Sequence, residues 1–247
     1  MSKIVASIEA RINSTRLPGK MLLNVGNYSM LELMIQRVLA SQLLDEIILA
    51  TTNTPNDDPL EELGHKLGIK VYRGSEKDVL NRVVEAHKEI SSDIIVELCG
   101  DCPLLDPAII DHCVELFLTS DADIVSTVFE QSYPQGQDVQ VFRTSDLIWV
   151  EKNIHDSAVR EHVSLYFYEN AERYKIKSAQ APEHLAEPNL RLQVDYKQDY
   201  ELVSKLHEAL YLSKGLYYSL GDMLDVLNRI PSLRSINEFC EEKPARI

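Results

Sequence analysis

The sequence predicts an α/β fold in which a doubly wound, mostly parallel sheet carries helices on both faces. Three observations support this prediction. Strand-like runs alternate with helical patterns over the first 128 residues. Four strand–helix pairs follow one another, and parallel neighbours require crossover connections of this kind. The 247 residues, of which 45% are hydrophobic and 26% charged, suit one globular domain of ordinary composition.

The elements of the first half follow in a regular order. Buried-type strands are expected at 3–9, 45–52, 69–74, 93–103 and 122–128. Amphipathic helices are expected at 29–41, 58–67, 78–90 and 107–118. In the first of these helices, apolar residues at 31, 34, 35 and 38 fall on one face. Pro107 stands in the first turn of the last helix, where proline is tolerated.

After about residue 128 the regular alternation stops. The segment 133–143 begins with turn formers and then alternates like an edge or exposed strand. Helices are expected at 145–152, 159–170, 198–212, 219–229 and 235–242, and strands at 174–180 and 190–195. We expect the strand at 190–195 to return to the sheet. The whole chain, 1–247, therefore reads as one domain with an inserted lobe at about 129–188.

Charge and composition exclude several classes of function. The formal net charge of -14 disfavours nucleic acid as a partner, because a negative field repels a polyanion. No run of about 18 apolar residues exists, so no membrane span is expected. The N-terminus passes directly into a strand-like run, which is not typical of a signal peptide. Four irregularly spaced cysteines do not form a disulfide framework, and we expect a cytoplasmic location.

Polar residues gather where the predicted strands end. They are Arg11, Arg16 and Lys20 after the first strand, Thr51 after the second, Arg73 after the third, Gly100 and Asp101 after the fourth, and Asp195 after 190–195. Ligands of open parallel sheets bind at this edge. Cations and loop amides bind phosphate oxygens, and carboxylates bind Mg²⁺. The set predicts a site for a nucleoside triphosphate with a divalent metal.

The loop after the first strand is not a standard phosphate motif. It lacks both G-x-x-x-x-G-K-[ST] and G-x-G-x-x-G. Its sequence, "ARINSTRLPGK" (10–20), resembles the signature A-R-x-x-S-x-R-L-P-G-K of the cytidylyltransferases that make CMP-activated sugars, among them the CMP-acylneuraminate and CMP-ketodeoxyoctulosonate synthetases. Five further segments are similar to the spore-coat polysaccharide branch in the same order: "YRGSEKDVLNRV" (72–83), "GDCPLLDP" (100–107), "PQGQDVQVF" (134–142), "REHV" (160–163) and "LQVDYKQDYELV" (192–203). The resemblance covers roughly residues 3–212.

This resemblance implies a Rossmann-like nucleotidyltransferase that joins CTP to a sugar acid, an ulosonic or nonulosonic acid, and releases pyrophosphate. It implies that Arg11 and Lys20 bind the CTP phosphates, and that Asp101 and Asp195 bind Mg²⁺. These four residues are the expected catalytic set. Further nucleotide contacts are expected from Ala10, Ser14, Arg16, Thr51, Arg73 and Gly100. Acceptor contacts are expected from Asp138, Arg160, Glu161 and His162. The resemblance also implies a homodimer formed through the inserted lobe.

Two residues depart from the family pattern. Glu9 stands where a glutamine is usual before "AR", and Asn13 replaces a common glycine. An acidic residue beside a phosphate site is unexpected, because like charges repel.

Each candidate has a structural alternative. The three cations of the loop also fit a solvated surface loop, Asp101 and Asp195 also fit helix N-caps, and His162 also fits a structural role. The C-x-x-C at 99–102 has no partner motif for zinc. The D-x-D at 121–123 precedes its strand, as a helix-to-strand connection does. The rival functions are a nucleotide-sugar-dependent glycosyltransferase of similar fold and a non-catalytic nucleotide-binding relative.

Overall fold

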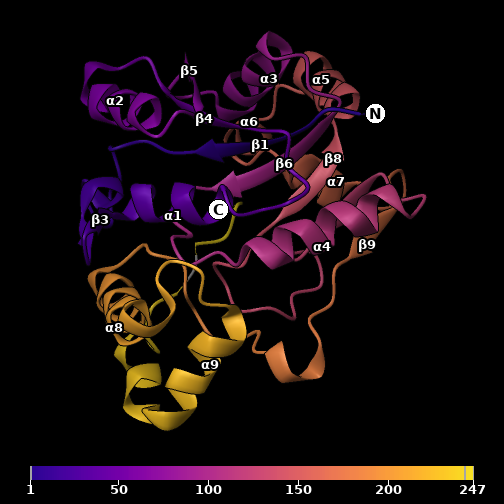
Figure 1. Ribbon diagram of the computed structural model, residues 1–247. Coiled ribbons are helices and arrows are strands. Elements are labelled where there is room, and N and C mark those ends of the chain that lie inside the picture. The colour runs from indigo at the N-terminus through magenta and orange to yellow at the C-terminus, as the bar shows by residue number, and fades with distance from the viewer. Residues whose placement is uncertain (1, 242, 247) are drawn as a thin grey trace.

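A computed structural model describes residues 2–241 and 243–246 (Figure 1). Its centre is a seven-stranded sheet in the order β5-β4-β1-β6-β8-β7-β9. In that order the strands are β5 (Lys70–Gly74), β4 (Glu46–Thr52), β1 (Ile4–Glu9), β6 (Ile94–Cys99), β8 (Gln140–Arg143), β7 (Ile124–Ser126) and β9 (Ile176–Ser178). Only β8 is antiparallel to its neighbours among these described strands. The predicted α/β class and mostly parallel sheet are confirmed.

Helices cover both faces of the sheet. Helices α1 (Met30–Val38) and α4 (Pro107–Leu118) lie on one face, and α3 (Val79–Glu89) and α5 (Thr144–Asn153) lie on the other (Figure 1). The remaining elements are α2 (Asp58–Lys66), α6 (Ser157–Glu161), α7 (Leu165–Glu169), α8 (Lys197–Lys214), α9 (Leu220–Arg229), the hairpin β2 (Asn24–Val25) and β3 (Tyr28–Ser29), and the 3₁₀ turns η1 (Lys20–Leu22), η2 (Pro55–Asp57), η3 (Glu183–Leu185) and η4 (Pro231–Ile236). Short polar side chains cap several helices, as Asp78 does for α3 and Asp106 for α4.

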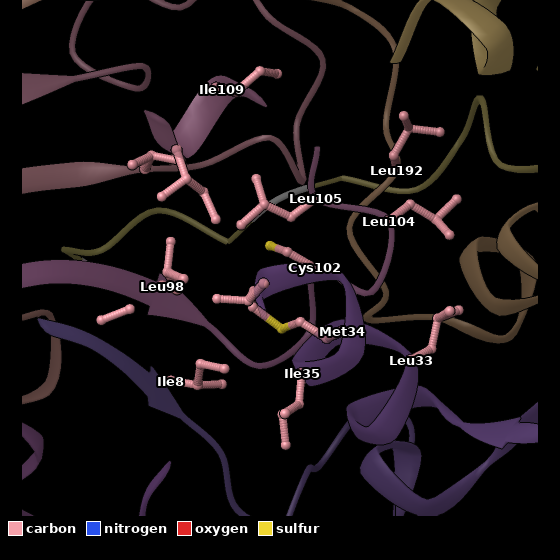
Figure 2. Packing of buried hydrophobic residues seen from close by; sticks show 14 of the residues in the cluster. Ile8, Leu33, Met34, Ile35, Leu98, Cys102, Leu104, Leu105, Ile109 and Leu192 are labelled. Atoms are coloured by element: carbon pink, nitrogen blue, oxygen red, sulfur yellow. The ribbon is translucent and has the colours of Figure 1, made fainter. Parts of the chain in front are cut away.

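Strand alternation divides the core between the two faces. Ile8 of β1 and Leu98 of β6 point to the α1/α4 face, where they pack near Met34 and Ile35 of α1 (Figure 2). Each such buried side chain contributes about 1.5–3 kcal/mol to folding. Because successive residues alternate, the neighbours of Ile8 and Leu98 along each strand face the opposite side, toward α3. Polar residues in this second set are therefore available to a site on that face.

Three predicted elements are wrong. The segment 190–195 is not a strand of the sheet, because its backbone pairs with loop residues: Leu192 N donates to Gln135 O (2.7 Å) and Val194 N to Asp101 O (2.9 Å). The helix expected at 159–170 is two short helices, α6 and α7. Of the helix expected at 235–242, only the end of η4 exists in the described residues, which exclude 242.

The segment 129–188 is built into the central sheet. It supplies β8, which lies between β6 and β7, and β9 at the sheet edge. Strand β8 is consequently an interior strand and not the edge strand that its sequence favours. Phe142 of β8 and Phe167 of α7 pack with ring centroids 5.1 Å apart, in the core between the sheet and the helices α3 and α5. Within the described residues, no helix is both long enough and apolar enough to cross a bilayer.

Candidate active site

A cavity of about 480 Å³ opens where β1 and β6 end and extends over the sheet face that carries α3. Ten of the predicted site residues line it: Ala10, Arg11, Ser14, Arg16, Lys20, Gly100, Asp101, Glu161, His162 and Asp195. We call Arg16, Lys20, Asp101 and Asp195 the rim. The sequence segments that carry the rim are far apart, so the fold brings them together.

Lys20 joins the rim into one network. Its ammonium group donates to Asp101 Oδ2 (2.8 Å), Asp195 Oδ1 (2.9 Å) and the carbonyl of Val194 (2.8 Å). Gly19 precedes it with φ of 69°, a left-handed conformation that glycine adopts without strain. The turn directs Lys20 inward, and the residue is only 5% exposed. Two carboxylates distant in sequence therefore face one point.

Close backbone contacts fix the two carboxylates. A Cβ at Gly100 would lie 2.8 Å from the Glu9 carbonyl, so only glycine lets the end of β6 approach β1 this closely. Arg191 donates to Asp195 Oδ2 (2.8 Å) and to Asp199 Oδ1 (3.1 Å). Asp106 caps α4, and Asp199 forms the capping box of α8. The capping alternative for Asp101 and Asp195 is therefore wrong.

Ion pairing outweighs burial at the rim. Burial alone would raise the pKa of Asp195, but Lys20, Arg16 and Arg191 leave that pKa below its ordinary value. Burial alone would lower the pKa of Lys20, but Asp101 and Asp195 raise it. Lys20 and Asp195 therefore stay ionised at neutral pH, as a site for a highly charged ligand requires.

The other loop cations also lie at the cavity. Arg16 pairs with Asp195 Oδ1 at 2.8 Å, and its guanidinium lies over the Tyr196 ring. Arg11 donates to Glu161 Oε1 (2.7 Å) and to the Glu76 carbonyl (3.1 Å). The alternative of a solvated surface loop is therefore wrong, because all three cations make specific contacts around one cavity.

Four predicted site residues do not line the cavity. Thr51 is fully buried in β4, and Arg73 holds the loop after β4 through the carbonyls of Thr52 (2.9 Å) and Thr54 (2.7 Å). Arg160 binds Asp78 and the carbonyl of Glu151, which fixes α6 against α3 and α5. Asp138 lies in a turn, where its Oδ2 accepts from Gly136 N (3.2 Å). The Arg73, Arg160 and Asp138 side chains thus hold loops and helices, whereas the buried Thr51 hydroxyl has no hydrogen-bond partner among the described residues.

A second set of residues, not predicted from the sequence, also lines the cavity. Glu97, Gln140, Ser164 and Tyr168 line the part of the cavity over the sheet, together with Arg82 of α3. We call four of the residues that line this part of the cavity the inner end: Glu9, Glu97, Gln140 and Tyr168. One signal was available: Glu97 is the one carboxylate within the apolar strand "IIVELC" (94–99). Charged side chains are seldom buried in such runs, because burial of an unpaired charge costs free energy.

The inner end holds two carboxylates that few cations balance. Burial, then the proximity of Glu97, raises the pKa of Glu9. Burial raises the pKa of Glu97 to about 7. Arg82 favours ionisation of Glu9, but Arg11 is already paired with Glu161. Glu97 is thus partly protonated at neutral pH, unlike Asp195 at the rim.

The remaining motifs carry no chemistry in this structure. Burial raises the pKa of both the Cys99 and Cys102 thiols, which disfavours the reactive thiolate. Asp123 accepts from Lys175 N (2.9 Å) and Asp121 from Lys175 Nζ (2.7 Å), so the D-x-D anchors the strand connection as expected.

Two carboxylates are the protein donor set that fits Mg²⁺ shared with substrate phosphates. In the described residues no cluster of three or more histidine, cysteine or acidic groups exists that could hold a metal by itself. Asp101 and Asp195 converge on one nitrogen, and so fit a cation that completes its coordination with phosphate oxygens and water.

Comparisons with known proteins agree with this geometry. A family model described as cytidylyltransferase matches residues 5–223. The chain belongs to the cytidylyltransferase family. It is therefore a CTP-dependent nucleotidyltransferase, which decides against the glycosyltransferase and the non-catalytic relative.

Individual relatives extend over the whole chain. The chain is 36% identical over 244 residues to an uncharacterised protein of Methanocaldococcus jannaschii, covering 99% of this chain and 98% of the relative. It is 31% identical over 245 residues to the spore coat polysaccharide biosynthesis protein SpsF of Bacillus subtilis, covering 96% and 99%. A cytidylyltransferase structure from Leptospira borgpetersenii superposes with a TM-score of 0.89 at 32% identity, covering 95% and 97%. The expected spore-coat branch is thereby confirmed.

Proposed function

We propose that this cytidylyltransferase joins CTP to a sugar acid, giving a CMP-sugar and pyrophosphate for cell-surface polysaccharide biosynthesis. The observation that supports the proposal is the Lys20 bridge between Asp101 and Asp195 at the mouth of the cavity. The bridge puts a cation for phosphate and two carboxylates for a metal at one place. The similarity to a spore coat polysaccharide biosynthesis protein supports the polysaccharide context.

The reaction forms one bond and breaks one. The acceptor hydroxyl oxygen attacks the α-phosphorus of CTP, the bond to the pyrophosphate oxygen breaks, and the hydroxyl proton leaves to solvent. Lys20, Arg16 and Arg11 neutralise the charge that develops on the departing pyrophosphate. Asp101 and Asp195 would hold Mg²⁺, which when bound polarises the phosphoryl oxygens and lowers the pKa of the hydroxyl.

A pyrophosphate-release screen tests the proposal. CTP, UTP, GTP and ATP are each offered with a panel of eight- and nine-carbon 2-ulosonic acids in the presence of Mg²⁺. We expect release only with CTP and an acceptor of this class. Release with CTP and neutral sugars alone, or none with any acid, contradicts the proposal.

We also propose that the chain acts in the cytoplasm as a homodimer that pairs through 129–188. Light scattering at micromolar concentration is expected to give twice the 28.1 kDa mass of one chain. A single species of 28.1 kDa contradicts the dimer.

A further inference from the structure

Two acceptor oxygens at the inner end of the cavity have no hydrogen-bond partner in the part of the chain that the structure describes. Glu97 Oε2 and Gln140 Oε1 are both buried without a hydrogen-bond partner among the described residues. Glu97 is 5% exposed and Gln140 7% exposed, and both line the cavity. A buried acceptor left without a donor destabilises the protein. These two oxygens are therefore open to a donor from a bound ligand.

The topology brings these acceptors together. Glu97 of β6 and Gln140 of β8 are direct partners in the antiparallel register, so their side chains are neighbours on the same face. Glu9 lies one strand away on β1, where Ser7 is the register partner of Glu97. Two carboxylates and one amide oxygen thus face the same part of the cavity.

The charges that line the cavity do not cancel there. At the rim, Lys20 and Arg16 are paired with Asp101 and Asp195, and further out Arg11 is paired with Glu161. Arg82 acts on Glu9, and its Nη1 already donates to the Ser75 carbonyl (2.5 Å). Among the described residues, no cation lowers the pKa of Glu97.

We propose that the acceptor presents a protonated amine to Glu97 and Gln140, so that the substrate is an amino-substituted sugar acid. This inference rests on the proposed function. An ammonium group has three donors and one positive charge. It can therefore donate to both unpartnered oxygens and neutralise the Glu97 carboxylate. A hydroxyl brings one donor and no charge, and an N-acyl amide also brings one donor and no charge.

The rest of the acceptor also fits this cavity. Arg82 Nε is buried without a partner in the described residues, which leaves one donor for the carboxylate of a sugar acid. Burial raises the pKa of Glu97 to about 7, so an arriving ammonium group would stabilise the ionised carboxylate. Binding of the amine then releases protons from the inner end.

Matched acceptors test the inference. Eight- and nine-carbon 2-ulosonic acids are supplied in triplets that differ at one carbon, which carries hydroxyl, N-acetylamino or free amino. We expect kcat/KM for pyrophosphate release to be at least about tenfold higher for one free amine than for its two partners, as for a charge-assisted hydrogen bond. A preference for the hydroxyl or the N-acetyl compound in every triplet overturns the inference.

The Glu97→Gln variant adds the decisive control, because it removes the charge and keeps the shape. We expect it to lower kcat/KM for the amine by about 10- to 100-fold and to abolish the preference over the hydroxyl compound. The matched variant Glu115→Gln, exposed on α4, is expected to behave as the wild type. An amine preference retained in Glu97→Gln overturns the inference.

Calorimetry separates this inference from the proposed function. The same triplets are titrated into the protein with CTP omitted, in two buffers of different ionisation enthalpy. Tighter binding of the amine with proton release, both lost in Glu97→Gln, supports the inference even if no acceptor is turned over. Absence of turnover with every acceptor contradicts the proposed function alone, while equal binding within the triplets contradicts the inference alone.

Discussion

The rim and the inner end of one cavity handle charge in opposite ways. At the rim, Lys20 and Arg16 meet Asp101 and Asp195, and Arg191 gives Asp195 a further partner. At the inner end, Arg82 acts on Glu9, no described cation acts on Glu97, and burial keeps the pKa of both carboxylates above the ordinary value. The difference shows that a buried carboxylate stays ionised only where the fold brings cations to it.

The comparison also separates the two substrates. The rim matches the pattern of charge that a triphosphate with Mg²⁺ requires, and it is the part of the cavity that the sequence predicted. The inner end suits a group rich in hydrogen-bond donors, which we propose that the acceptor supplies and CTP does not.

The largest effect is expected for Lys20→Met. Removal of the ammonium leaves the buried Asp195 and the half-buried Asp101 with fewer partners, which costs about 3–5 kcal/mol of folding stability. Transition-state stabilisation should fall by about 3–4 kcal/mol, seen as a loss of 10²- to 10³-fold in kcat for pyrophosphate release. Urea unfolding measures the first effect. The control is Lys66→Met, whose ammonium pairs with Glu32 at the surface; a kcat within threefold of wild type for Lys20→Met refutes the role.

Asp101→Asn should change the metal requirement. One of the two proposed Mg²⁺ ligands loses its charge, so the Mg²⁺ concentration for half-maximal activity should rise by about tenfold or more. A titration of activity with Mg²⁺ measures this. Asp225→Asn, exposed on α9, serves as the matched control. An unchanged midpoint for Asp101→Asn means that this carboxylate is not a ligand.

Glu97 at the inner end should make the free energy of unfolding depend on pH. Glu97 has a folded pKa of about 7 against 4.5 ordinarily, so the folded state holds the proton more tightly. The free energy of unfolding should therefore fall as pH rises from about 4.5 to about 7, by on the order of 3 kcal/mol. Glu97→Gln should remove this part of the slope. Denaturant unfolding between pH 5 and 8 measures it, and equal slopes in both proteins contradict the assignment.

The smallest effect is expected for Arg73→Met, outside both regions. Loss of its hydrogen bonds to the Thr52 and Thr54 carbonyls should lower the free energy of unfolding by about 1–2 kcal/mol. The KM for CTP should stay within twofold, because the guanidinium holds a loop and does not line the cavity. A tenfold rise in KM with unchanged stability would instead support the nucleoside contact that the family resemblance implies.

The rim could be predicted from the sequence because the order of the strands fixes where its residues lie. Residues after parallel strands share one edge of the sheet, so Lys20 and Asp101 were expected together before any contact was known. Asp195 was found through an incorrect element, since 190–195 is not a strand. Its position comes from the backbone pairing of Leu192 and Val194 with loops that themselves end at the cavity. The predicted position of Asp195 at the cavity was therefore correct, although the strand predicted at 190–195 was not.

The surroundings of Arg160, Asp138, Glu97 and Gln140 were harder to predict for a physical reason. Arg160 and Asp138 stand in segments that resemble the family, but the ion pairs and turns that hold them are decided by neighbours far along the chain. Glu97 and Gln140 lie 43 positions apart, and nothing in either segment indicates the other. Only strand pairing makes them neighbours.

The alternation of strands and helices, and the loop that carries Arg11, Arg16 and Lys20, determine the fold class and the nucleotide edge by themselves. Local periodicity and crossover geometry leave few arrangements open for such a chain. The tertiary structure alone decided that β8 enters the sheet antiparallel between β6 and β7. A short alternating strand has the same pattern at an edge or in the interior, so its partners, and hence the meeting of Glu97 with Gln140, depend on how the whole sheet assembles.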